Sequence, residues 1–167
     1  MKTLNKSKGK KGQIVIDILI FAVILFTFGI VVILGHKILV EYQSSVNSTF
    51  SSAAQNVMQQ GVNTNENMDF LFAFIIVGML IVTIITSFMI RSHPIFFILS
   101  LIVLIISIIL AAIMSNIFTA ITQTPELIND TARFTIIPAV EDKLPLFVLI
   151  FAALSIIILY AKSRSSG

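Results

Sequence analysis

Residues 18–35 read ILIFAVILFTFGIVVILG, an apolar run that holds one threonine, two glycines and no charge. An α-helix needs roughly 20 such residues to cross the hydrocarbon core of a bilayer. In lipid an open sheet would leave backbone groups without partners, so the many Ile and Val residues do not indicate strands here. The run, extended to about residues 14–40, therefore predicts a transmembrane helix.

The composition of the whole chain is typical of a membrane protein. Of its 167 residues, 57% are hydrophobic and 11% are charged, and the mean hydropathy is +1.03. A soluble domain of this length could not bury so much apolar surface. The chain has two histidines and no cysteine, which excludes a disulfide, a thiolate metal site and a histidine cage. No catalytic motif is present either, so we expect no catalytic residue, no metal, no cofactor and no enzyme activity.

Three more apolar segments follow the first, at about residues 70–90, 95–121 and 144–161. We therefore predict an all-α, polytopic membrane protein with four transmembrane helices. It would comprise a basic N-terminal segment over 1–12, a first helix with an extension beyond the bilayer over 13–61, and a three-helix transmembrane region over 62–167.

The basic residues indicate the orientation of these helices. Positive charges favour the cytoplasmic side of a membrane, and three segments are basic and free of acids, with the residues Lys2, Lys6, Lys8, Lys10, Lys11, Arg91, Lys162 and Arg164. The other two loops are rich in acids. This alternation predicts four crossings with both termini inside. The lysine cluster of the N-terminal segment is then expected to contact anionic lipid headgroups, capsid protein or nucleic acid.

A helical stripe follows the first span. Its members lie four, four, three and four residues apart, namely Tyr42, Val46, Phe50, Ala53 and Val57. We predict that the first helix continues from Gln13 to Gln60 and ends at Gly61, with the stripe as a contact to copies of the chain or to another protein. The alternative is a short amphipathic helix on the outer membrane surface.

Asp17 is the one acid inside an apolar run, near its inner end. Such groups are functional candidates, because a charge in lipid is costly. Asp17 is a candidate assembly contact, with pairing to a lysine of the N-terminal segment or a role in proton or ion translocation as alternatives. At the outer end, His36 and Lys37 are expected to anchor the helix at the interface.

Several features of the remaining chain yield smaller expectations. The apolar patch Phe134–Pro138 is expected to dip into the membrane interface. Gly78 and Ser87 are candidates for close approach between helices. The serines along the third span are expected to form interhelical hydrogen bonds, and they are Ser100, Ser107 and Ser115.

The stretch KKGQIVID, residues 10–17, resembles the class III signal of archaeal type IV pilins. That family has a basic pair, a Gly and a Gln, an acid at the fifth residue after the cut, and a long apolar helix. The resemblance implies processing after Gly12 and places Asp17 where the family has a Glu that neutralises the N-terminal amine of a neighbouring subunit. It favours an archaeal cell or an archaeal virus as the source.

The second and third spans, with their short link around residues 90–97, look similar to small membrane proteins of viruses that carry a lipid membrane. This resemblance implies a structural protein that packs as an oligomer, or with capsid proteins, in a virion membrane or host cell membrane. One alternative is a small channel, holin-like or transporter subunit. The other is a pilin-related component of a secretion system.

Overall fold

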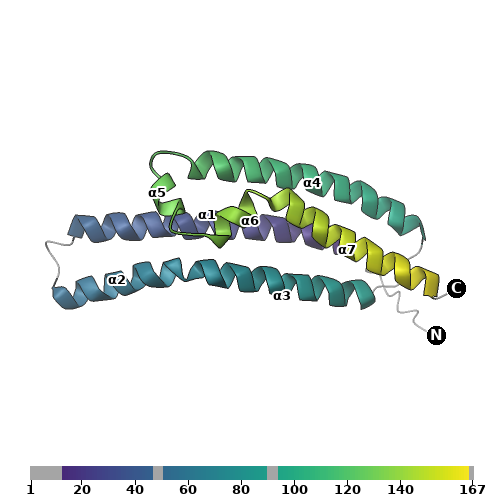
Figure 1. Cartoon of the computed structure of the whole chain (residues 1–167), viewed down its shortest axis with the longest axis horizontal. Helices are drawn as coiled ribbons and strands as arrows, with labels where there is room; N and C mark the ends of the chain where they lie inside the picture. Colours follow the sequence, from purple (N-terminus) through teal and green to yellow (C-terminus); the bar gives the residue numbers. More distant parts are fainter. Residues whose placement is uncertain (1–12, 47–50, 90–93, 166–167) are drawn as a thin grey trace, which may run out of the picture.

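The computed structural model describes residues 13–46, 51–89 and 94–165 of the chain. Every regular element in these ranges is a helix (Figure 1), in the order α1 (Gln13–Val46), α2 (Ser52–Glu66), α3 (Met68–Met89), α4 (Pro94–Thr122), α5 (Ile128–Thr131), α6 (Ile136–Glu141) and α7 (Leu144–Ser165). The predicted all-α class is confirmed.

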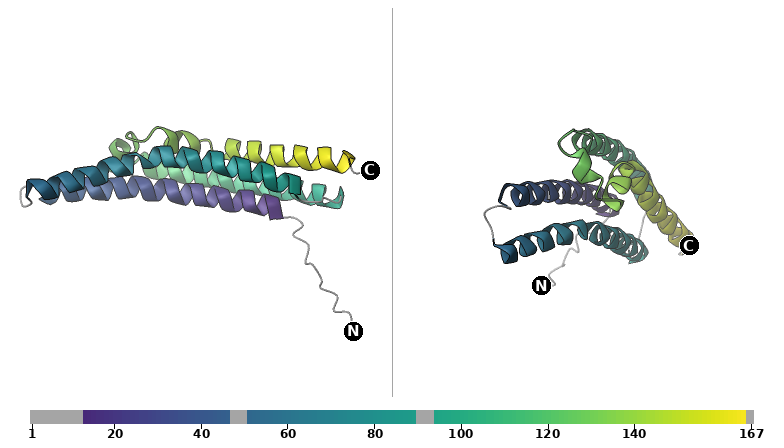
Figure 2. Two further views of the ribbon diagram at one scale, coloured as in Figure 1. Left: turned by 90° about the horizontal axis from the view of Figure 1, so that it is seen from below. Right: turned by 60° about the vertical axis from the view of Figure 1, so that its left-hand side comes forward.

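The long helices form an elongated bundle in which α1, α3, α4 and α7 lie alongside one another, and α2 continues nearly in line with α3 (Figure 2). Three helical stretches are long and apolar enough to cross a membrane, Asp17–Ser45, Ser52–Phe88 and Ser100–Thr122. The stretch Leu144–Ile158 of α7 is apolar but shorter. Among the described residues, three helices therefore have the length and apolarity needed to span a membrane.

One face of α1 supplies much of the core. Its buried residues recur three or four positions apart, so they share one side of the helix, and they include Ile18, Ala22, Leu25, Gly29 and Ile33. Aromatic pairs connect this helix to two others. The ring centroids of Phe21 and Phe151 of α7 lie 5.4 Å apart, and those of Phe28 and Phe72 of α3 lie 5.8 Å apart. These contacts make α1 the central helix of the bundle.

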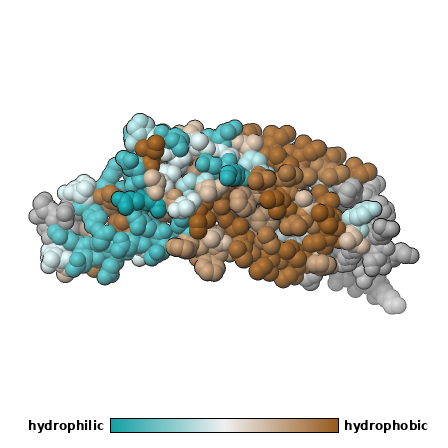
Figure 3. All heavy atoms as spheres, in the orientation of Figure 1, coloured by the Kyte–Doolittle hydropathy of each residue, from teal (hydrophilic) through white to brown (hydrophobic). Residues whose placement is uncertain are grey.

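The outer surface of the same bundle is strongly apolar, as Figure 3 shows for one face. Large side chains on every long helix are more than half exposed, among them Val31, Phe74, Ile105 and Ile157. A soluble monomer rarely exposes a continuous apolar surface of this kind, whereas lipid tails solvate it at no cost. The hydrophilic residues gather at one end of the molecule, around α2 and the end of α1.

The predicted continuous helix from Gln13 to Gln60 is wrong. Helix α1 ends at Val46, and α2 begins at Ser52 and packs back along α1. Just before the end of α1, the hydroxyls of Ser44 and Ser45 both donate to the backbone oxygen of Glu41, at 2.8 Å each. Such side chains compete with the helix for backbone groups, which is why they are common where helices end.

The helix boundary predicted at Gly61 is also wrong. The side-chain oxygen of Ser51 accepts a hydrogen bond from the backbone N–H of Ala54 and caps the start of α2. From there α2 passes through Gly61 and ends at Glu66, with Asn67 as its C-cap. The extension beyond the apolar bundle is thus a hairpin of two helices, joined by a hydrogen bond of 2.9 Å from Gln43 Nε2 to Gln59 Oε1.

Candidate functional site

The connection between α4 and α7, residues 123–143, folds back among the long helices. Its apolar patch Phe134–Pro138 does not dip into the interface as expected, because Phe134 and Ile137 are buried in the protein core. A buried backbone needs hydrogen-bond partners, and the short helices α5 and α6 pair part of the backbone of this connection. Three acidic residues then determine how this connection meets α1 and α3.

Asp69, in the first turn of α3, caps α6 from another part of the chain. Its carboxylate oxygens accept hydrogen bonds from the backbone N–H groups of Thr135, Ile136 and Ile137, at 2.8 to 3.0 Å. The first N–H groups of a helix have no partner within the helix, and their dipoles favour a negative charge. Asp69 is 8% exposed, and its bond to the N–H of Ile137 is buried, so water has little access to that contact.

Glu141, at the end of α6, packs against Gly29 of α1. A Cβ added at Gly29 would lie 3.1 Å from Cγ2 of Ile137 and 3.2 Å from Oε1 of Glu141. Gly29 belongs to the apolar run 18–35, so the carboxyl group lies beside the apolar part of α1. The residue is fully buried, and neither carboxyl oxygen has a hydrogen-bond partner among the described residues.

Burial of Glu141, and secondarily the charge of Asp142, raise the pKa of Glu141 from 4.5 to about 8. This residue lies in α6, outside the three helical stretches of spanning length. An ionised carboxylate without a partner is expensive in such a place, so the neutral acid is the stable form. Glu141 is therefore a proton-bearing side chain within the bundle at neutral pH.

We expect the stability of the protein to fall as the pH rises from 4.5 to about 8. In this window the unfolded chain has released the Glu141 proton and the folded chain keeps it, so the slope is up to about −1.4 kcal/mol per pH unit. Glu141→Gln should flatten this dependence. The midpoint of denaturant-induced unfolding, measured across the pH range, tests this.

The matched control for that measurement is Glu126→Gln, because Glu126 is an exposed acid of the same connection. It should keep the slope of the wild-type protein. A Glu141→Gln variant with an unchanged slope would show that Glu141 is not the group responsible.

His36 is the third point of attachment, and the expectation that it anchors the helix at the interface is wrong. It is 2% exposed. Its Nδ1 lies 3.0 Å from Oδ1 of Asp130 on α5, and its Nε2 lies 3.4 Å from Oε1 of Glu66 on α2. The ring of Phe134 packs edge-on against it, with centroids 5.4 Å apart.

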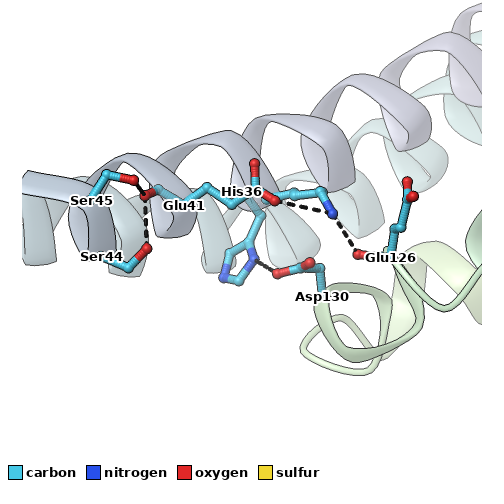
Figure 4. Close-up of polar contacts among 7 residues, drawn as sticks. His36, Glu41, Ser44, Ser45, Glu126 and Asp130 are labelled. Carbon is cyan, nitrogen blue, oxygen red and sulfur yellow. Dashed lines mark hydrogen bonds and ion pairs between the residues drawn. The ribbon is translucent and has the colours of Figure 1, made fainter.

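Lys37, next in the chain, also contacts the 123–143 connection. Its Nζ donates to the backbone oxygen of Glu126 at 2.8 Å and pairs with a carboxylate oxygen of Glu41 at 3.2 Å. Figure 4 shows His36 and Asp130 in contact nearby, so two consecutive residues of α1 hold the start of the 123–143 connection.

A pocket of about 380 Å³ lies beside His36, between α1, α2 and α5. Its walls combine two valines with polar and charged side chains, and the lining residues that matter here are His36, Gln43, Gln59, Glu66, Asp130 and Arg133. The pocket gives the buried imidazole and its two carboxylates a route to solvent. We define His36, Glu66 and Asp130 as the His36 cluster.

The residues singled out in the sequence do not meet at this pocket. Asp17 is exposed near the start of α1, and no residue of the His36 cluster lies near it in the sequence. Tyr42 on α1 is 53% exposed and Val57 on α2 is 67% exposed, with Ala53 exposed as well. They lie on two helices of the hairpin instead of one continuous face. The side chain of Val46, as well as Phe50 and the lysines of residues 1–12, lie outside the described residues.

Two further expectations can be compared with the structure. Ser115 forms the expected bond between elements, since its hydroxyl donates to the backbone oxygen of Asp142 at 2.9 Å. Ser107 instead donates to Val103 within its own helix. Gly78 is not a site of close approach, because a Cβ added there would meet nothing within 4 Å. That site is Gly29.

The residues that sequence reasoning missed share one signal. Gly29 and His36 are seven residues apart, which places them on one face of a helix about 10.5 Å from each other. Each meets an acid of the 123–143 connection, Glu141 and Asp130 respectively. A small residue and a polar residue on one face of a predicted span are therefore the sequence signal that could have indicated that a folded connection packs against α1.

Comparison with known family models, curated proteins and solved structures found no match to this chain.

Proposed function

We propose that this protein is a structural component of a membrane assembly, in which its polar hairpin binds a neighbouring protein. The observation that carries the proposal is the hairpin of α2 and the end of α1, which extends beyond the apolar bundle as a mainly uncharged, hydrophilic surface (Figure 3). Ser, Asn and Gln side chains interact weakly with lipid headgroups but suit a protein partner. The neighbour is another copy of the chain or a second membrane or capsid protein.

Within this proposal the chain crosses the bilayer four times, with both termini inside. The distribution of Lys and Arg supports that orientation. The fourth crossing is α7, whose apolar stretch Leu144–Ile158 is shorter than the others.

The setting that we propose is the membrane of a virion, with a host cell membrane as the site of assembly. The resemblance of the second and third spans to small proteins of membrane-containing viruses supports it. Asp17 and the lysines of residues 1–12 would add contacts at the inner surface, to a neighbouring subunit and to anionic lipid, capsid protein or nucleic acid. No catalytic step is needed for such a role.

We expect Val57→Arg to reduce incorporation of the protein into its assembly about tenfold, a loss of about 1.4 kcal/mol of contact free energy. Val57 is 67% exposed on α2, so a charge there does not disturb the fold but meets the partner. The measurement is the fraction of protein that sediments with membrane particles, or with large complexes after mild detergent extraction.

The matched control is Asn56→Arg, at an exposed neighbouring position of α2 outside the apolar stripe. It adds the same charge and should leave incorporation unchanged. A wild-type protein found only as a monomer in the cell membrane, and absent from particles, would reject the proposed function.

A further inference from the structure

The strongest unassigned feature of the molecule is a buried imidazole between two carboxylates. In the His36 cluster, Asp130 Oδ1 lies 3.0 Å from Nδ1 and Glu66 Oε1 lies 3.4 Å from Nε2. The two acids come from α5 and α2, so the ring on α1 joins three elements. His36 is 2% exposed, and its Nε2 has no well-formed hydrogen bond among the described residues.

A neutral imidazole cannot satisfy both acids, because only one of its nitrogens carries a hydrogen. If Nδ1–H donates to Asp130, the lone pair of Nε2 faces an oxygen of Glu66. If Nε2–H points to Glu66, the lone pair of Nδ1 faces an oxygen of Asp130 at 3.0 Å. An additional proton, on the ring or on one carboxyl group, gives both contacts a hydrogen. The arrangement therefore fits a cluster with one proton more than a neutral ring and two carboxylates.

The other charged groups around the cluster do not supply the positive charge that would balance its two carboxylates. On α1, Lys37 is engaged by Glu41 and by the backbone oxygen of Glu126. Asp69 of α3 accepts three backbone hydrogen bonds at the start of α6. After α5, Arg133 lines the pocket and is exposed to solvent. Among the described residues, no lysine or arginine forms an ion pair with Glu66 or Asp130, so a proton is the positive charge that fits.

We propose that the His36 cluster is a proton-binding site that fastens the polar hairpin to the 123–143 connection. With the additional proton bound, α2 and α5 are both hydrogen-bonded to α1. After its release, one of the two contacts brings acceptor lone pairs together, and α2 or α5 separates from the ring. The pocket of about 380 Å³ gives the proton its path. This inference does not depend on the partner of the hairpin.

The direction of the effect follows from this count of protons. The fastened state binds more protons than the loosened state, so acid favours the fastened state and a rise in pH favours the loosened one. The surface offered to a neighbouring protein would then change with pH.

Electron spin resonance on the full chain in lipid nanodiscs tests the proposal, because the protein has no cysteine of its own. Spin labels at Gln60→Cys on α2 and Ala132→Cys after α5 occupy exposed positions on the two elements that the cluster joins. We expect a narrow distance distribution at about pH 5 and a broader one at about pH 8, the range in which imidazole changes charge.

The control variants separate the cluster from other titrating groups. His36→Gln, which cannot gain a proton, should lose the pH dependence, and His93→Gln, at the second histidine of the chain, should keep it. The ¹⁵N shifts of the His36 ring should change with the same midpoint as the distances.

Two results would overturn the proposal. The first is a wild-type distribution that does not change with pH, and the second is a pH dependence that persists in His36→Gln.

Discussion

Asp69→Ala is expected to lower the free energy of unfolding by about 3 kcal/mol, because it leaves one buried and two partly buried N–H groups without their carboxylate partner. These are the N–H groups of Thr135, Ile136 and Ile137, and all of them donate to the Asp69 carboxylate. Helix α6 has six residues, too few to be stable without this cap. The midpoint of unfolding in mixed detergent micelles measures the loss.

The effect should depend on the acceptor oxygens and not on the removal of a charge. Asp69→Asn keeps one acceptor oxygen and should cost about half as much. Glu126→Ala removes an exposed acid from the 123–143 connection and should be neutral within about 0.5 kcal/mol. Equal effects of Asp69→Ala and Glu126→Ala would contradict the capping role.

Gly29→Leu is expected to destabilise the protein by about 3 kcal/mol and to displace α6 from α1. Even a Cβ at this position would lie 3.1 Å from the side chain of Ile137 and 3.2 Å from the Glu141 carboxyl group. Neither neighbour has room to retreat, since both are fully buried. Displacement of α6 should also expose Glu141. Faster hydrogen exchange in α6 and loss of the pH dependence of the unfolding free energy would report this exposure.

Gly78→Leu is the matched control for this substitution. Gly78 is also a glycine within an apolar helix, but its position is exposed and a Cβ there would meet nothing within 4 Å. The added leucine would contact lipid, so stability should be unchanged or slightly raised. A loss in Gly78→Leu as large as that in Gly29→Leu would indicate a general penalty for leucine, not a close contact with α6.

The two glycines also show where sequence reasoning succeeds and fails. The four apolar segments were correctly predicted as helices, because hydropathy and length are properties of a continuous stretch. Whether Gly29 or Gly78 faces another helix depends on how each helix is rotated about its own axis. Hydropathy does not report this rotation, because these helices are apolar on every side. Likewise, the spacing of Tyr42 and Val57 fits one helix as well as two separated by a turn.

The sequence by itself determined the all-helical class, the position of the apolar helices and the separation of apolar from polar regions, since each follows from local composition. Only the tertiary structure decided that the first helix ends at Val46 and that α2 folds back along it. It alone placed Asp69 at the start of α6, Glu141 against Gly29 and His36 between Glu66 and Asp130. These contacts join residues that are about 30 to 110 positions apart, and the physical reason is the need of buried polar groups for partners wherever the fold supplies them.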